Sequence, residues 1–440
     1  MLFAITALLI DLKLRGFWFA RGLIVALGLM FGVILKEYGF DTATILISWC
    51  ILYVAKGLSF LSVDSLSPER QHRISNVACF LAIGCAVLMA FVGINLVVMS
   101  AFIVLLQPAI REAIHDGTVY VRERGDWPLG VDVASALSNE IGKSLGAALI
   151  SVVGLLMAMG VSWLMVGLAA FSLIIIWGHQ KPALPDISSE KTPARAAHPR
   201  IGPVAKGFLC MSFIHNGVFF AIQSFLSLAL YDLLVEGGFG ADIIGTLGLM
   251  LTAMMIIGLM VFSWFRKRAG TLTEGHGRSP MLGFALGSLA LLASLSFVVI
   301  GLWQSGLIGS GLTALLIGTL MGMLMAFGGF FTLGALQLLD AIYRHKAPSE
   351  RNECRKRVLH LNMMICQFSP AMVLLGIYGA SLHFETLSDL AYIVTGLIAA
   401  VEGMMVLFCL SLSRAGLNIQ KPITASTGGI PGASSPCGPL

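Results

Sequence analysis

Three ionisable side chains stand inside long apolar stretches, where a charge is expensive. Glu402 lies in AAVEGMMV, Lys56 in LYVAKGLSF and His215 in SFIHNGVFF. A charge at the centre of a bilayer-spanning helix costs several kcal/mol, so each of these groups needs a partner or a water-filled cavity. Burial favours the protonated form of a carboxyl group, and a neutral imidazole can also carry a proton. We therefore expect proton or ligand chemistry at these positions.

Each of the three residues also has a structural interpretation. The sequence does not decide between the functional and the structural interpretation. Glu402 could be a neutral, hydrogen-bonded packing residue. Lys56 could extend its ammonium group to the interface, or gate a pathway, instead of contacting a ligand. A single histidine in an apolar helix is more often a hydrogen-bonded core residue than a functional one. Weaker candidates are Asn216, Gln223, Gln107 and Arg21.

The composition explains why charges are so informative here. Of 440 residues, 57% are hydrophobic and 12% are charged, whereas soluble domains carry about 25% charge. A bilayer span takes about 20 apolar residues. The chain is thus expected to be an integral membrane protein with no soluble catalytic domain, which excludes most enzymes. We also expect no nucleic acid, because the net charge of +5 comes from basic residues in short loops.

The cysteines indicate neither a disulfide framework nor a metal site. Six of the eight lie inside apolar runs, and no CxxC or Cys/His cluster occurs. We expect them to be small core residues, and we expect no metal and no cofactor.

Apolar runs of about 20 residues predict twelve membrane spans in an all-α polytopic protein. Their expected limits are Gly16–Lys36, Thr42–Val63, Ile74–Gly93, Leu96–Ile114, Val133–Met159, Val161–Trp177, Lys206–Leu230, Ile243–Phe265, Met281–Trp303, Leu307–Phe331, Val358–Leu382 and Leu390–Leu412. The predicted domains are a lead-in (1–15), a first six-helix bundle (16–177), a linker (178–205), a second bundle (206–413) and a disordered tail (414–440). The lead-in has no positive segment before its apolar stretch, so it does not fit a signal peptide.

The distribution of basic residues predicts the orientation. With both termini cytoplasmic, 24 of the 28 Lys and Arg residues fall on the inside. Only Lys36 falls outside, while the outside loops carry acidic residues. This asymmetry is the positive-inside pattern.

Two loop segments suggest an internal repeat. KEYGFDTATI (36–45) follows span one and VEGGFGADII (235–244) follows span seven, with Glu, Gly-Phe and the final Ile in register. Halves of six spans that both begin inside must run parallel to one another. Chance similarity of two short loops is the alternative.

The twelve spans, the six-to-six split and the parallel halves resemble the major facilitator superfamily, over about residues 16–414. That family has a GxxxDRxGRR motif between spans two and three, and this chain has FLSVDSLSPERQHR. Asp64 is kept, Phe60 replaces the first glycine, and the basic pair is displaced to Arg70 and Arg73. The second half keeps only the charges of SWFRKRAG.

The resemblance implies roles for the polar residues. Spans one, four, seven and ten line the central cavity in that family, which places His215, Asn216, Gln223, Gln107 and Arg21 by location. A cytoplasmic charge network would lock the outward-open state, with ordinary juxtamembrane charge as the alternative. Its expected members are Asp64, Arg70, Arg73, Arg111, Glu140 and Lys143.

Small residues predict close helix packing in span five. Gly142 and Gly146 form a GxxxG face on which a neighbouring helix can approach closely, and Gly318 and Gly322 repeat the spacing in span ten. The Gly-Pro pair of the family's antiporters is missing from span five.

The expected function is secondary transport of a small solute by alternating access, without a nucleotide motif and coupled to an ion gradient. The expected partners are the lipid bilayer and a small-molecule or ion substrate, and we expect a monomer in a bacterial inner membrane. A transport-inactive sensor or assembly factor on the same fold is the alternative. A polytopic membrane enzyme is less favoured, because the inner loops show scattered basic residues instead of acid and histidine clusters.

Overall fold

The computed structural model describes residues 14–64, 68–124, 201–238, 280–343, 348–384 and 386–419. Residue 346 and scattered positions from 134 to 148 and from 246 to 260 are also described. Within these residues the chain forms long helices and no strand, so the predicted all-α fold class is confirmed.

Each of the long described helices overlaps one predicted span. The first half has α2 (Arg15–Glu37), α3 (Thr42–Asp64), α4 (Pro68–Val92) and α5 (Leu96–Arg124). The second half has α8 (Pro203–Glu236), α10 (Pro280–Gln304), α11 (Ser310–Tyr343), α12 (Pro348–Ser381) and α13 (Leu387–Ile419). Spans five, six and eight, the lead-in, and most of the linker and tail lie largely outside the described residues.

Several helices are longer than the predicted spans. The helix α12 begins at Pro348 instead of Val358, and α5 continues past Ile114 to Arg124. Both extensions are polar, which is why apolar runs could not locate them. Proline opens four of the helices, where its missing N–H group costs nothing. Six described helices are long and apolar enough to cross a membrane, and α3 and α11 carry shorter apolar segments.

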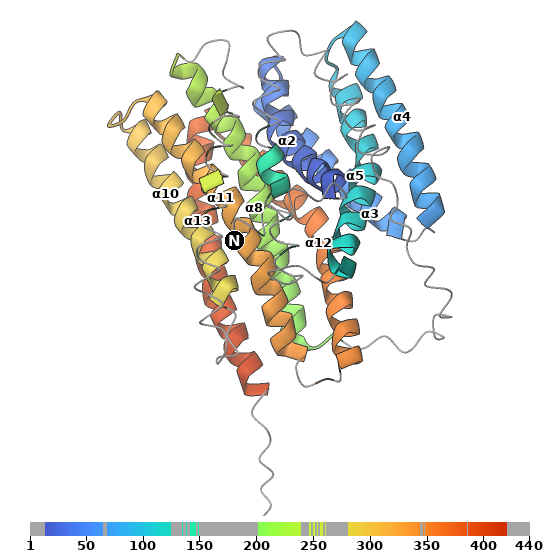
Figure 1. Ribbon diagram of the computed structural model, residues 1–440. Coiled ribbons are helices and arrows are strands. Elements are labelled where there is room, and N and C mark those ends of the chain that lie inside the picture. Colours follow the sequence, from blue (N-terminus) through green and yellow to red (C-terminus); the bar gives the residue numbers. More distant parts are fainter. Residues whose placement is uncertain are drawn as a thin grey trace, which may run out of the picture.

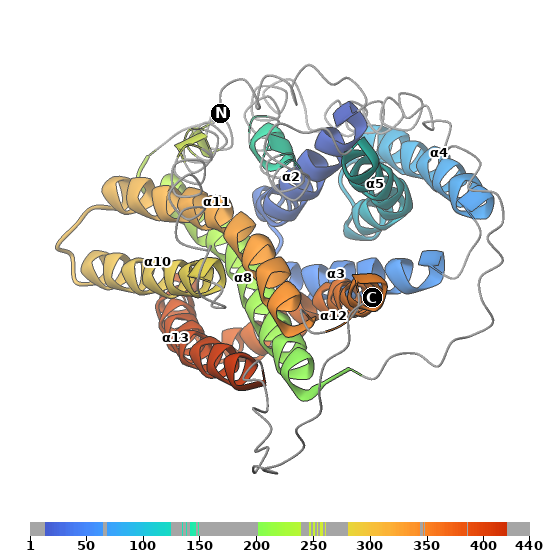
Figure 2. The same ribbon diagram turned by 60° about the horizontal axis from the view of Figure 1, so that its bottom comes forward.

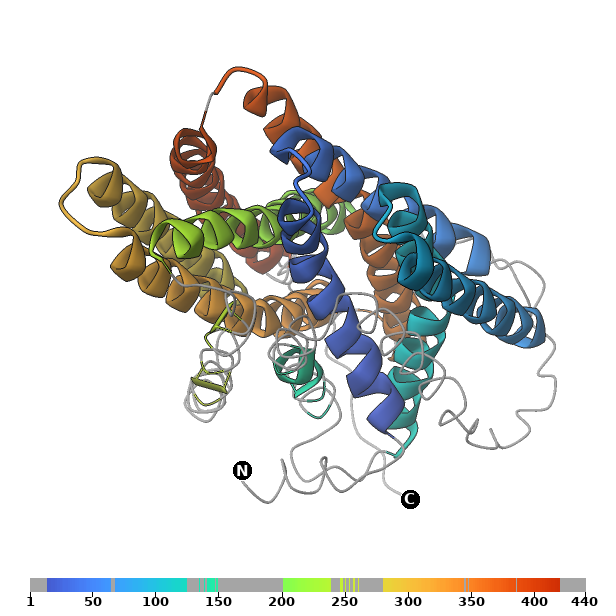
Figure 3. The same ribbon diagram turned by 90° about the horizontal axis from the view of Figure 1, so that it is seen from above.

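The two halves lie side by side. Figures 1 and 2 show α10, α11 and α13 on one side of the molecule and α4 and α5 on the other. Seen from above, α10 and α4 lie at opposite edges (Figure 3). Between them, α2 packs against α8 and α3 packs against α12. These two helix pairs form the interface between the halves.

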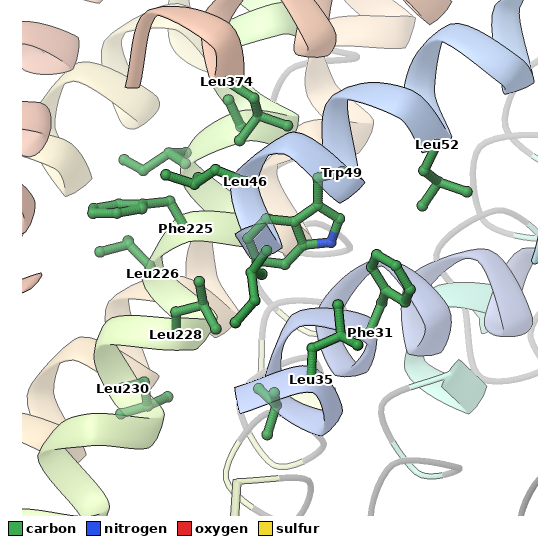
Figure 4. Close-up of a cluster of buried hydrophobic side chains, with 14 of the residues drawn as sticks. Phe31, Leu35, Leu46, Trp49, Leu52, Phe225, Leu226, Leu228, Leu230 and Leu374 are labelled. Carbon is green, nitrogen blue, oxygen red and sulfur yellow. The ribbon is translucent and has the colours of Figure 1, made fainter. Parts of the chain in front are cut away.

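An apolar cluster fills this interface (Figure 4). Phe31 from α2, Trp49 from α3, Phe225 from α8 and Leu374 from α12 are almost completely buried and belong to one hydrophobic core. The core therefore joins helices of both halves, as the burial of apolar surface favours.

The predicted close packing at span five is confirmed. A Cβ atom added at Gly146 would lie 2.4 Å from the carbonyl oxygen of Gly22 on α2. One added at Gly142 would lie 2.6 Å from Cβ of Arg21. Only glycine allows the two backbones to approach so closely.

The ends of α2 and α8 support the internal repeat. The helices end at Glu37 and Glu236, which are aligned in the repeat. Gly39 follows with φ of 80° and Gly238 with φ of 73°, again at aligned positions. A left-handed glycine after a helix is a common cap, because an L side chain would be strained there.

Candidate functional site

The structure brings together His215 and Glu402, which the sequence indicated separately. His215 lies on α8 and Glu402 on α13, and Nδ1 of His215 is 3.1 Å from Oε2 of Glu402. The two side chains are 4% and 0% exposed. Leu397 and Met404 are exposed on the opposite face of α13, so Glu402 faces the protein interior and not the lipid.

Aromatic side chains surround this His215–Glu402 pair. The imidazole is stacked on Phe331 of α11, with ring centroids 4.1 Å apart and 16° between the planes. His215 also lines a small cavity together with Phe219 and Phe327. The pair therefore lies inside the second half, between α8, α11 and α13, and not at the interface between the halves.

Counting protons shows what this pair can do. With one proton between Nδ1 and Oε2, the pair is neutral overall, either as imidazolium and carboxylate or as imidazole and carboxylic acid. In both forms Nε2 of His215 carries a hydrogen. Losing one proton leaves a net charge of −1 in a buried environment, and Oε1 of Glu402 has no hydrogen-bond partner among the described residues. The pair can thus exchange a single proton between a neutral and a charged state.

A second arrangement surrounds Lys56, on the face of α3 that meets the other half. Its ammonium group lies over the rings of Tyr53, at 5.7 Å from the centroid, and of Phe220 on α8, at 6.0 Å. The exposed apolar residues of α3 are Ile47, Ile51, Val54 and Leu58. At 100° per residue, these four form a stripe opposite to Tyr53 and Lys56. Lys56 therefore faces the interface between the halves, which argues against the expectation that it extends toward lipid headgroups.

Further polar residues line this region on α8. The Tyr53 hydroxyl lies 3.5 Å from the hydroxyl of Ser224. Asn216 donates a hydrogen bond to the carbonyl oxygen of Ser212 on its own helix, at 2.8 Å. Gln223 is buried, with no hydrogen bond to a described residue.

The two weaker pathway candidates of the first half lie on α2 and α5. Gln107 is buried and donates to the carbonyl oxygen of Ile103, one turn earlier on α5. The Arg21 guanidinium lies 5.6 Å from the ring of Phe17 and acts electrostatically on Lys56. Arg21 and Lys56 thus belong to one charged region, whereas Gln107 is bound within its own helix.

The predicted inner charge network is described only in part. Arg70 and Arg73 are exposed on the first turns of α4. Glu140 and the side chain of Asp64 lie outside what the structure describes, while Arg111 and Lys143 are partly buried. The network stays a prediction.

A side-chain contact that was not predicted from the sequence joins α4 to α5. His72 Nδ1 lies 2.8 Å from Glu112 Oε1. Its sequence signal is weak, because both residues stand among other polar residues at helix ends.

The sequence analysis also missed a contact at the predicted outer end. Lys36 Nζ lies 3.4 Å from Asp232 Oδ2, and the Tyr231 hydroxyl donates to the carboxylate of Glu37. We call these two contacts the outer bridge. It joins the ends of α2 and α8, and so ties the two halves together at that face. The aligned repeat segments carry the signal that could have located it.

The described helices, with α2 packed against α8 and α3 against α12, form a fold that solved transporter structures share. No family model and no curated protein sequence matches the chain. Among solved structures, the nucleoside transporter NupG matches with a TM-score of 0.59 and 12% identity. The match covers 93% of this chain and 98% of the NupG chain.

A mutant of NupG and a second transporter show the same likeness. The mutant matches with a TM-score of 0.58. A bacterial homologue of the human lysosomal transporter Spinster, in an inward-facing and occupied conformation, matches with a TM-score of 0.53 and 13% identity. It covers 94% of this chain and 96% of its own. At these identities the likeness is one of fold.

Proposed function

We propose that the protein is a secondary transporter that moves a small solute by alternating access of its two halves. The observation that carries this proposal is the interface itself. It holds a polar and aromatic region at Lys56, Tyr53 and Phe220, and the outer bridge joins the halves beyond it. Alternating access requires a binding region between the two halves that opens to one side at a time.

The fold supports this proposal, because the similar structures are transporters by their own descriptions. In our proposal the described state is closed to the outside, and the solute reaches its site from the inside. The chain acts as a monomer in a bacterial inner membrane, with both termini in the cytoplasm and the two halves at residues 16–177 and 206–413. The positive-inside pattern supports the orientation.

The proposal includes coupling to protons through the His215–Glu402 pair. The pair is isolated from water, and it changes by one proton between its neutral and its charged state. Because both residues belong to the second half, the movement of one half against the other leaves their contact intact. What changes between the two orientations is the side from which a proton can reach the pair.

The experiment uses the purified protein in liposomes. Solute counterflow is measured with a panel of labelled neutral, anionic and cationic solutes, with a nucleoside included because of the NupG likeness. In the variant K36C with D232C, a bifunctional thiol reagent locks the outer bridge, and native cysteines are replaced beforehand. We expect the lock to abolish counterflow and a cleavable linker to restore it, while K36C alone is unaffected by the reagent. Undiminished flux in the locked variant contradicts alternating access, and absence of flux for every solute favours the transport-inactive alternative.

A further inference from the structure

Among the residues that the structure describes, no carboxylate balances the charge at Lys56. None of the carboxylates in the described part of the chain forms an ion pair with its ammonium group. The guanidinium of Arg21 on α2 is a second cation that repels it. By contrast, the buried carboxylate of Glu402 has His215 as a partner.

The two aromatic rings near Lys56 do not replace the missing negative charge. A cation over an aromatic face gains about 0.5 to 2 kcal/mol, and the attraction fades beyond about 6 Å from the ring centroid. Tyr53 and Phe220 lie at 5.7 and 6.0 Å, near that limit. A cation inside the membrane costs several kcal/mol. An unbalanced positive charge therefore remains at the interface between the halves.

The position of Lys56 indicates what balances the charge. The exposed apolar stripe of α3 lies on the face opposite to Lys56, so its ammonium group points away from that surface and toward the other half. Phe220 belongs to the other half, so a ligand at this ammonium group would contact both halves. The group that completes the site must arrive through the interface, as a transported solute does.

Neighbouring side chains fit the rest of such a solute. The hydroxyl groups of Tyr53 and Ser224 can donate hydrogen bonds to its oxygen atoms. The rings of Tyr53 and Phe220 can cover an apolar body. Neutral residues that donate hydrogen bonds beside a cation favour an anion over a neutral or cationic ligand.

We infer that the transported solute is a small organic anion whose carboxylate or phosphate group binds the ammonium group of Lys56. This inference rests on the proposed transport function and names the substrate class for the same site. In the unloaded protein the charge stays unbalanced, and it is neutralised when the solute binds.

The test compares ligands that share a phenyl ring and differ in the charge of the attached group. Benzoate, phenyl phosphate and the neutral benzamide are titrated into the purified full-length protein at constant ionic strength, and the thermal midpoint is followed. We expect one or both anions, but not benzamide, to raise the midpoint of the wild type. The preferred anion identifies the carboxylate or the phosphate class.

Variants then assign the response to Lys56. We expect K56Q to weaken the anion response at least tenfold and K56R to keep part of it. K206Q removes an exposed lysine at the start of α8 and should respond like the wild type. An unchanged response in K56Q overturns the inference, as does a wild type that responds equally to benzamide or to no anion up to about 10 mM.

Flux measurements separate this inference from the proposed function. Counterflow of a neutral or cationic solute that K56Q leaves unchanged would keep the transport function and overturn the anion site. A Lys56-dependent anion response without counterflow of any solute would keep the site and overturn the transport function. Both are supported if labelled benzoate or phenyl phosphate shows counterflow that K56Q abolishes and K206Q retains.

Discussion

The polar contacts inside the second half differ from those between the halves. Inside the second half, His215 and Glu402 are 3.1 Å apart and almost completely buried. Between the halves, Lys36 and Asp232 are 3.4 Å apart with side chains 26% and 30% exposed. Lys56, also at the interface, lies against aromatic rings instead of a carboxylate.

This difference separates two tasks. A buried pair that balances its own charge costs a great deal to break, so it holds a rigid unit together and can store a proton there. Partly exposed or unbalanced groups cost little to separate, because water or a ligand can replace the partner. The polar contacts between the halves can therefore separate and re-form, whereas the buried pair inside the second half stays in contact.

The largest effect should follow from changing the charge of the His215–Glu402 pair. Glu402→Gln keeps the shape and a hydrogen bond to His215 but cannot ionise. We expect solute exchange in liposomes to continue, while accumulation driven by a pH gradient falls to the equilibrium level. Normal accumulation in Glu402→Gln would make the carboxyl group structural. His215→Gln is the next variant to test, and normal accumulation in both would exclude proton coupling through the pair.

Breaking the pair should also cost stability. His215→Leu leaves the buried carboxylate of Glu402 without its partner, and we expect a loss of about 3 to 5 kcal/mol in the free energy of unfolding. The measurement is denaturant unfolding in mixed micelles. The double variant H215L with E402L replaces both groups by apolar ones and should recover most of that loss. If the double variant is no more stable than the single one, packing is responsible and not the charge.

The next largest effect should come from a substitution that disturbs the close backbone packing within the first half. Gly146→Ala places a Cβ atom 2.4 Å from a backbone atom of Gly22, which cannot move easily. We expect a loss of about 1 to 3 kcal/mol, seen as a lower thermal midpoint. Gly84→Ala is the matched control, since a Cβ atom there meets nothing within 4 Å on α4. It should be neutral or stabilise by up to about 1 kcal/mol. Equal effects at both sites would contradict the packing argument.

A smaller effect should come from Asp41, the residue that precedes α3 and caps its first turn. The carboxylate of Asp41 accepts hydrogen bonds from the backbone N–H and the hydroxyl of Thr44, and these bonds hold the pKa of Asp41 below its ordinary value. The stabilisation is therefore complete above the unfolded pKa of about 3.9 and is lost as the pH falls through the lower folded pKa. We expect Asp41→Ala to cost about 1 kcal/mol at pH 7. The cost, measured by thermal unfolding, should shrink in acid, and a cost that is independent of pH would exclude the cap.

The smallest loss of stability should come from the outer bridge. Lys36→Gln should cost at most about 1 kcal/mol, because the ion pair is partly exposed. It should instead favour opening to the outside, which Cys50 can report. This α3 thiol contacts the carbonyl oxygen of Ala371 on α12, across the interface. With Cys50 as the only cysteine, we expect its labelling by an impermeant maleimide to become several times faster. An unchanged rate means that the bridge does not hold the outer face closed.

The fold was largely predictable because membrane spans leave a local signal. A run of about 20 apolar residues forms a helix wherever it occurs, since its backbone groups must pair within the segment. Nine predicted spans lie on described helices. The polar ends of α5 and α12 were missed, because helices that continue outside the membrane need no apolar residues.

The site was predictable only residue by residue. The cost of a buried charge is readable from the sequence, and it indicated Lys56, His215 and Glu402. The sequence does not show which charged residues are partners. His215 and Glu402 are 187 residues apart and come into contact only because α8 packs against α13. The outer bridge was missed for a related reason. Charges at the ends of spans look alike whether or not they have a partner.

The outer bridge has a consequence for the history of the chain. In the repeat, Asp232 corresponds to Val33 and Tyr231 to Gly32. An ancestral dimer of two identical first halves would thus place each Lys36 beside a valine. A dimer of two second halves would keep the tyrosine contact, through Tyr231 and Glu236, but lack a cation for Asp232. The Lys36–Asp232 ion pair of the bridge therefore forms only between unlike halves, so the two halves are not interchangeable at this contact.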